Sequence, residues 1–228
     1  MAGLPYKLGD TAGIRSPESL GSKSSLPRHH YDEISDFGRQ NGGIAYGNLY
    51  GAGQHAVLLA HGAVFDKESW DELAQALSAA GYQALAIGFR GYGKSTAGRS
   101  GNALYQDVLA GIRYLHSAGS EQVSVIGASM GGGAVAQAAV VVEPGEIDKL
   151  ILLAGVPIAT PERIQGDKLF IVSRGDSLRD AVEGQFERAG EPKELTVLTG
   201  SEHAQHIFRS RRPGEELTAA IIEWLAVE

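Results

Sequence analysis

The sequence predicts an α/β fold in which a mostly parallel central sheet carries helices on both faces. Short apolar runs rich in valine, isoleucine and leucine alternate along the chain with segments whose apolar residues recur at helical spacing. One such run, residues 123–126, leads through a Gly-x-Ser-x-Gly turn at 127–131 into a small aliphatic segment at 134–142. This alternation favours parallel strands, and in such sheets the functional site gathers at the carboxyl ends of the strands.

The composition is typical of one soluble globular domain. With 228 residues, of which 43% are hydrophobic, the chain is long enough to bury a full core. The net charge of −7 argues against nucleic acid or an anionic membrane as a partner. The sequence does not indicate which oligomeric state the protein adopts. The absence of cysteine excludes disulfides and thiolate chemistry. Neither a membrane-spanning apolar run nor a signal-peptide core is present, so a cytoplasmic protein is expected.

Residues 1–40 are rich in glycine, serine, proline and charge, and they show no sustained period. They are expected to form an arm, partly disordered, ahead of a single α/β domain at 41–228. His29 and His30 lie in this arm. Because no further ligand is near them in sequence, this pair is expected to be solvated rather than metal-bound.

The strands are predicted from apolar runs that end in glycine or polar residues. Residues 43–50 alternate weakly between apolar and polar and are expected to form an edge strand. The remaining strands are expected to be buried, at 54–60, 82–87, 123–126, 149–154, 168–173 and 194–198.

The helices are predicted where apolar residues recur every three or four positions. Trp70, Leu73 and Leu77 place a helix at 67–80, which Gly81 ends. A second helix, at 102–118, carries an apolar face made of Leu104, Val108, Ile112 and Leu115. Three further helices are expected at 134–142, 178–188 and 215–227.

The turn at 127–131 is the strongest chemical signal in the chain. Gly-x-Ser-x-Gly alone is a weak pattern among 31 glycines, but here a buried strand precedes it and a helix follows it. A nucleophile elbow requires this context, because its sharp turn strains the serine backbone and its glycines let strand and helix pack closely. Ser129 is therefore predicted to be a nucleophile. The Met130 N–H lies at the start of the helix, where an anion is favoured.

A second motif, Gly88-Phe-Arg-Gly-Tyr-Gly-Lys94-Ser95, matches the phosphate-binding loop of P-loop NTPases. That loop needs a helix to begin at the Lys-Ser pair, so that backbone N–H groups point at phosphate. Here a glycine-containing loop follows instead, and no later strand ends directly in an aspartate that could help to hold magnesium. Nucleotide binding is therefore the less favoured interpretation of this segment.

A serine hydroxyl needs a base, usually a histidine that a carboxylate orients. An elbow predicts the chain order Ser, acid, His, with both partners on loops after later strands. Asp176 follows strand 168–173 after a glycine turn and is the favoured acid, although aspartate at such a joint also often caps the next helix. Asp180 should already lie within that helix, and Asp167 lies at the wrong end of its strand.

Two histidines follow the last strand. His203 is expected on the loop and His206 about one helical turn further on. His203 is the favoured base, because a loop position lets its ring reach Ser129, and His206 is the alternative base. Their spacing also suits a zinc pair, but no third ligand is evident, so no metal site is assigned.

The tetrahedral intermediate of acyl transfer needs two donors for its oxyanion. One is expected to be the Met130 N–H. The other should come from the loop after the first buried strand, where Gly62 permits a tight turn and the Ala63 N–H would face the oxygen. His61 precedes the elbow, which breaks the expected order, so it is predicted to be structural.

Together these segments resemble the α/β-hydrolase fold family. The matching pieces are His61-Gly62, the Arg-Gly-x-Gly-x-Ser loop at 90–95, the elbow at 127–131, the turn at Gly175-Asp176 and the segment at 200–203. Two positions depart from the pattern of many relatives, which carry Asp where this chain has Gly88 and Gly where it has Ala204. The resemblance implies an eight-stranded sheet. Because only residues 155–167 occupy the place where relatives insert a cap, a cap-less, open site is expected.

The predicted activity is that of a serine hydrolase that cleaves carboxylic esters through an acyl-enzyme on Ser129. A small-molecule ester or acyl compound is the expected substrate, and no cofactor is needed. Phe65, Trp70 and Ile158, with Met130, are candidate apolar walls of its pocket. A thioesterase or an acyltransferase would use the same residues, and a non-catalytic ligand-binding protein on this fold is an alternative of a different class.

Overall fold

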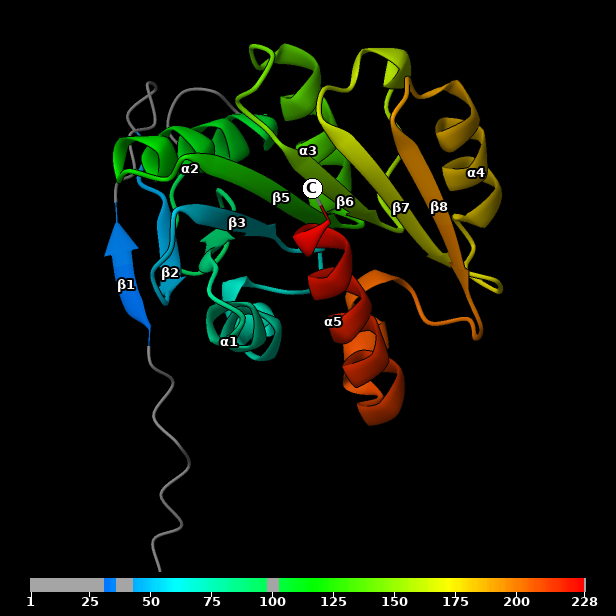
Figure 1. The fold of residues 1–228 in the computed structure, drawn as a ribbon, viewed down its shortest axis with the longest axis horizontal. Coiled ribbons are helices and arrows are strands. Elements are labelled where there is room, and N and C mark those ends of the chain that lie inside the picture. Colours follow the sequence, from blue (N-terminus) through cyan, green and yellow to red (C-terminus); the bar gives the residue numbers. More distant parts are fainter. Residues whose placement is uncertain (1–30, 36–42, 98–102, 228) are drawn as a thin grey trace, which may run out of the picture.

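The computed structural model of the chain describes residues 31–35, 43–97 and 103–227. His29, His30 and most of the predicted arm lie outside the described residues. The described chain folds around one eight-stranded sheet with the strand order β1-β2-β4-β3-β5-β6-β7-β8 (Figure 1). The pairs β1–β2 and β2–β4 are antiparallel, and the other neighbours are parallel. The predicted fold class, a mostly parallel sheet with helices on both faces, is confirmed.

Most of the strands lie within a residue or two of their predicted positions. Their bounds are Asp32–Ser35 (β1), Tyr46–Tyr50 (β2), His55–Ala60 (β3), Gln83–Gly88 (β4), Gln122–Ala128 (β5), Lys149–Leu153 (β6), Asp167–Ser173 (β7) and Lys193–Leu198 (β8). The central strands β3 to β7 are buried almost throughout, because helices cover both of their faces.

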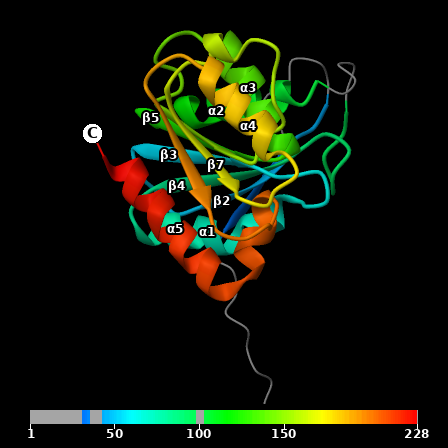
Figure 2. The same cartoon turned by 90° about the vertical axis from the view of Figure 1, so that its right-hand side faces the viewer.

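Five α-helices and three short 3₁₀ helices are described. The α-helices are Asp71–Ala79 (α1), Tyr105–Ser117 (α2), Met130–Val141 (α3), Arg179–Arg188 (α4) and Arg211–Ala226 (α5). The 3₁₀ helices are Lys67–Trp70 (η1), Pro161–Arg163 (η2) and Ala204–Arg209 (η3). Helices α1 and α5 lie on one face of the sheet, and α2, α3 and α4 lie on the other (Figures 1 and 2). The core therefore has two apolar layers, one on each side of the sheet.

Three expectations about the elements are wrong in detail. Strand β2 is not the edge of the sheet, because β1, from the segment predicted to be an arm, pairs outside it. Helix α5 begins at Arg211 and not at 215. Pro213 is tolerated in the first turn because backbone N–H groups there have no acceptor within the helix, so the N–H that proline lacks is not missed. The predicted helix at 67–80 begins as the 3₁₀ turn η1, and the side chain of Asp66 caps it by accepting from Ser69 N.

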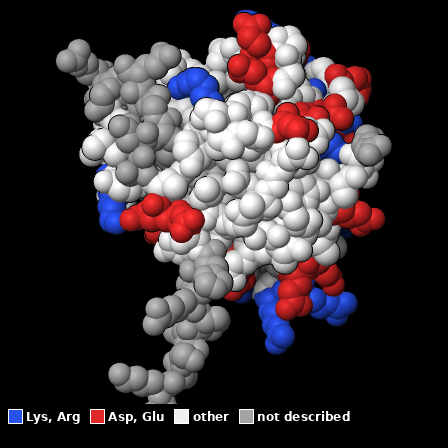
Figure 3. All heavy atoms as spheres, turned by 60° about the vertical axis from the view of Figure 1, so that its left-hand side comes forward, with Lys and Arg blue, Asp and Glu red and all other residues white. Residues whose placement is uncertain are grey.

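Charges of both signs are scattered over the surface. On the face in Figure 3, small groups of acidic and basic side chains surround a broad area of uncharged residues. None of the helices in the described part of the chain is long and apolar enough to cross a membrane.

Candidate active site

Ser129 lies at a sharp bend between β5 and α3, at the carboxyl end of the sheet. Its backbone has φ 51° and ψ −114°, a left-handed conformation that costs a non-glycine residue about 1–3 kcal/mol. Hydrogen bonds on both sides hold the bend, from Ser129 N to Leu153 O (3.0 Å) and from Val156 N to Ser129 O (2.9 Å). The surrounding sheet therefore maintains a conformation that the serine alone would not adopt.

Two glycines allow this bend to pack. A Cβ atom added at Gly127 would lie 2.5 Å from Gly131 O, and one added at Gly131 would lie 2.3 Å from Ala60 O. Carbon and oxygen atoms cannot approach this closely. The first turn of α3 thus lies directly on the ends of β3 and β5, as the elbow motif predicts.

The imidazole of His203 lies between Ser129 and Asp176. Its Nε2 is 2.7 Å from Ser129 Oγ, and its Nδ1 is 2.8 Å from Asp176 Oδ2. The Asp176 side chain is fully buried, whereas about a third of the His203 side chain is exposed. This arrangement makes Nδ1 the protonated nitrogen and leaves the Nε2 lone pair facing the serine hydroxyl.

The alternative acids and base lie elsewhere. His206 is in η3, where its ring packs edge-on against Phe65 with centroids 5.0 Å apart. Asp180 is exposed in the first turn of α4, and Asp167 begins β7 at the other end of the sheet. Among the described residues, no three His, Cys, Asp or Glu side chains are placed to hold a metal ion.

The loop after β3 passes beside the serine. A Cβ added at Gly62 would lie 3.5 Å from Ser129 Cβ, an ordinary van der Waals contact, so the loop lies directly against the elbow. In the part of the chain that the structure describes, the N–H groups of Met130 and Ala63 make no hydrogen bond. Both of the backbone donors predicted for an oxyanion are thus available.

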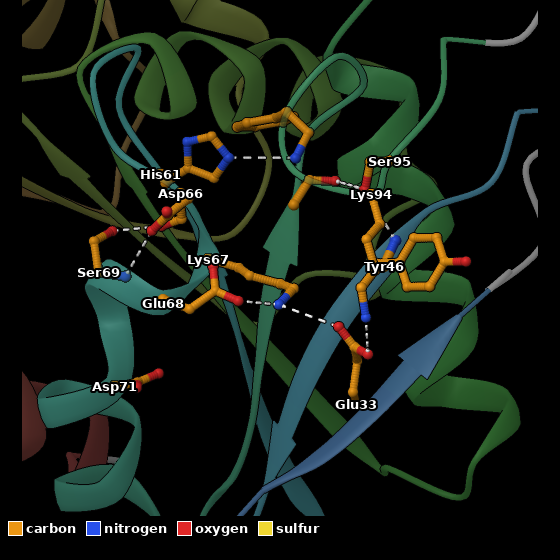
Figure 4. Close-up of polar contacts among 12 residues, drawn as sticks. Glu33, Tyr46, His61, Asp66, Lys67, Glu68, Ser69, Asp71, Lys94 and Ser95 are labelled. Atoms are coloured by element: carbon orange, nitrogen blue, oxygen red, sulfur yellow. Dashed lines mark hydrogen bonds and ion pairs between the residues drawn. The ribbon is translucent and has the colours of Figure 1, made fainter. Parts of the chain in front are cut away.

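His61 is fully buried and does not reach the serine. Its Nδ1 lies 2.9 Å from Gly62 O, and its Nε2 accepts the Phe89 N–H at 3.3 Å (Figure 4). Burial lowers the pKa of His61, although the bond to Gly62 O and the nearby carboxylates of Asp66 and Glu68 oppose this effect. A neutral imidazole fits both contacts, and its role there is structural.

The glycine-rich segment at 88–95 forms no phosphate site. No helix begins at Lys94 or Ser95, and the next helix among the described residues, α2, starts at Tyr105. Ser95 Oγ donates to Gly88 O at 2.8 Å and accepts from Tyr46 N, while the Lys94 ammonium binds Glu33 of β1 (Figure 4). The same packing explains the departure at Gly88, because a Cβ there would lie 3.2 Å from both Ser95 Oγ and Tyr46 O.

Two residues near the serine carry no signal in the sequence. Gln205 is 2% exposed, and its side chain accepts from Gly62 N and donates to Ser69 Oγ. Tyr92 Oη donates to Ala63 O at 2.9 Å and lies 3.6 Å from Met130 Sδ. Both contacts join segments that are far apart in the chain, so no local motif reveals them.

The candidate pocket walls are divided between two hollows. Phe65 and Trp70 line a groove between η1–α1 and η3–α5, and Gln205 also lines it. The Trp70 side chain is 1% exposed and packs edge-on against Phe208. Ile158 lines a separate pocket with Tyr105 and Val140. Packing therefore accounts for most of the buried surface of Trp70.

Solved structures of similar fold include an esterase of Pyrococcus furiosus, with a TM-score of 0.73 and 20% identity over 96% of this chain and 98% of that chain. A CIB-like hydrolase of Thermoplasma acidophilum matches with a TM-score of 0.69 and 21% identity, over 86% of this chain and 97% of that one. At these identities the likeness concerns the fold.

Among curated proteins, the dihydrolipoyllysine-residue acetyltransferase component of the acetoin cleaving system of Cupriavidus necator is 36% identical over 94 residues. The match covers 40% of this chain and spans about a quarter (24%) of the length of that relative. The family model described as serine aminopeptidase, S33, matches residues 51–173. Since that match covers more than half of the 228 residues, the chain belongs to the serine aminopeptidase S33 family of α/β hydrolases.

Proposed function

We propose that this hydrolase cleaves carboxylic esters through an acyl-enzyme on Ser129. The observation that carries the proposal is the pair of contacts made by His203, 2.7 Å from Ser129 Oγ and 2.8 Å from Asp176 Oδ2. Both distances lie within the range in which a base can take a proton from a serine and be oriented by a carboxylate.

In the first half-reaction, Ser129 Oγ attacks the acyl carbon while its proton moves to His203 Nε2. Asp176 accepts the Nδ1–H throughout and stabilises the imidazolium. When the intermediate collapses, the proton on Nε2 passes to the departing alkoxide, which leaves as the alcohol. The acyl group remains on Oγ as an ester.

Water completes the cycle by the same route. His203 Nε2 takes a proton from the attacking water and returns it to Ser129 Oγ as the acid is released. In both tetrahedral intermediates, the N–H groups of Met130 and Ala63 would donate to the oxyanion. One such donor contributes about 10²–10³ in kcat.

The test is turnover of short p-nitrophenyl esters by the wild type and by Ser129→Ala. We expect Ser129→Ala to lose at least about 10³-fold in kcat, because no nucleophile replaces the hydroxyl. Labelling by a fluorophosphonate should likewise require Ser129. Turnover that survives in Ser129→Ala would disprove the acyl-enzyme.

The chain contains a matched control for this test. Ser124 lies in the same strand, β5, and its Oγ is 2.8 Å from His55 Nε2, but this pair is near the amino end of the strand. Ser124 is fully buried. The variant Ser124→Ala should therefore keep both ester turnover and labelling.

Acyl transfer is the second candidate, and the 36% identity to an acetyltransferase component favours it. In an acyltransferase, a thiol or alcohol would attack the acyl-enzyme in place of water. In a thioesterase, a thioester would acylate Ser129 and release its thiol, and water would then free the acid, so both would use the same side chains. Adding an alcohol or a dithiol to the ester assay distinguishes transfer from hydrolysis, because transfer produces a new ester or thioester in place of free acid, and a thioester substrate tests for a thioesterase. A non-catalytic ligand-binding protein predicts neither turnover nor labelling by the fluorophosphonate.

A further inference from the structure

Gln205 joins the loop that carries the proposed base to the loop that carries the proposed oxyanion donor. Its Oε1 accepts the Gly62 N–H at 2.6 Å, and its Nε2 donates to Ser69 Oγ at 2.8 Å. Ser69 Oγ donates in turn to Asp66 O. With its side chain buried and both amide atoms in use, Gln205 has one orientation that satisfies all its partners.

Each peptide of the 61–63 loop is fixed by a separate partner. Gly62 O accepts from Phe65 N at 3.1 Å and lies 2.9 Å from His61 Nδ1. In a trans peptide the N–H points opposite to the C=O, so these bonds aim the Ala63 N–H away from the His61 ring. Tyr92 holds Ala63 O, and Gln205 holds the Gly62 N–H on the preceding peptide.

We propose that Gln205 is a positioning residue that holds the peptide before the one carrying the Ala63 N–H and thereby helps to preorganise the oxyanion hole. This inference rests on the proposed function, since it concerns a donor used in that reaction. Gln205 touches no reacting atom. It acts by keeping the peptide between His61 and Gly62 from rotating, and rotation of that peptide would tilt the next one, which carries the donor.

Replacing Gln205 by methionine keeps the length and apolar volume of the side chain and removes both hydrogen bonds. The Gly62 N–H is then left without an acceptor in a buried place, and the loop must shift to find one. A misplacement of about 1 Å costs on the order of 100-fold in rate, so we expect Gln205→Met to lower kcat by about 10- to 100-fold. KM should change little, because the donor acts mainly on the transition state.

Two readouts separate this route from a merely structural effect. The affinity of a trifluoromethyl ketone, whose hemiketal oxygen occupies the oxyanion position, should fall by about the same factor as kcat/KM. The pH dependence of kcat should keep its shape, because the contacts of His203 are untouched. A changed pH profile with unchanged ketone affinity would mean that Gln205 positions His203 and not the oxyanion donor. This result would overturn the inference.

Gln185 is the matched control. It is also buried, and its Oε1 also accepts a backbone N–H at 2.6 Å, from Ile158 on a different loop. Gln185→Met should therefore lower thermal stability about as much as Gln205→Met, yet keep kcat and the ketone affinity within about threefold, since no oxyanion donor depends on it.

The outcomes distinguish this inference from the proposed function. If Ser129-dependent turnover is present and Gln205→Met keeps its kcat within threefold, the inference is wrong and the proposed function stands. If the wild type shows no Ser129-dependent turnover, both are wrong. Should Gln205→Met fail to fold, Ser69→Ala decides, because it frees the Gln205 amide to rotate. A severalfold lower kcat in that variant is expected, and an unchanged kcat overturns the inference.

Discussion

At the scale of single residues, Asp176 occupies a position for which the sequence allows two roles. An aspartate between a strand and a helix can cap the helix or serve as an acid. In the structure Asp176 does not cap α4, because the N-cap of that helix is Leu178. Asp176 Oδ1 accepts from Leu178 N at 2.8 Å in the turn before α4, and Oδ2 lies 2.8 Å from His203 Nδ1. The turn into α4 thus helps to aim the carboxylate at the His203 ring.

These two contacts make Asp176→Asn informative. An amide has one acceptor oxygen, so it cannot accept from both Leu178 N and His203 Nδ1, and it carries no charge to stabilise an imidazolium. We expect kcat on p-nitrophenyl esters to fall by about 10³- to 10⁴-fold, as for other triads that lose this charge. Asp180→Asn is the control, since that exposed carboxylate on α4 should be replaceable without loss. Equal activity of the two variants would exclude Asp176 as the orienting acid.

At the scale of helices and strands, the sequence predicts what is local and periodic. Trp70, Leu73 and Leu77 lie at helical spacing and are buried in or beside α1, as predicted. Strand β1 could not be predicted, because Asp-Glu-Ile-Ser has one apolar residue in four and becomes a strand only by pairing with β2. The helix expected at 215–227 begins earlier than predicted, and Gly214 lies inside α5, where a Cβ would lie 3.0 Å from Phe208 Cα.

Two glycines in helices should respond oppositely to alanine. At Gly131, in the first turn of α3, a Cβ would lie 2.3 Å from Ala60 O, so Gly131→Ala should push α3 off β3 and cost about 1–3 kcal/mol of unfolding free energy. Gly184, in α4, has nothing within 4 Å of an added Cβ, and Gly184→Ala should stabilise by about 0.5–1 kcal/mol through helix propensity. Urea unfolding measures both, and ester turnover should fall only in Gly131→Ala. Matching shifts in the two variants would refute the close approach at the elbow.

At the scale of the whole molecule, the site is assembled from contacts between distant parts of the chain. Chain order and strand ends were enough to select Ser129, Asp176 and His203, because parallel strands bring their carboxyl ends to one edge of the sheet. The contact between Gln205 and Gly62 spans 143 residues and could not be predicted, since many other polar side chains follow the last strand. A fold class therefore predicts which loops meet, and packing decides which side chains within them touch.

The buried His61 should make global stability depend on pH. Burial lowers its pKa in the folded protein below the ordinary value of about 6.5 that it regains on unfolding. Between these two values the unfolded chain binds the proton and the folded one does not, so the unfolding free energy falls as pH drops below about 6.5, by at most about 1.4 kcal/mol per pH unit for one histidine. Urea unfolding from pH 7.5 to 5.5 should show a smaller loss for His61→Asn, whose amide can still donate to Gly62 O. Parallel curves for the two proteins would mean that His61 has the same pKa in the folded and unfolded states, and the expected lowering of its pKa by burial would then be wrong.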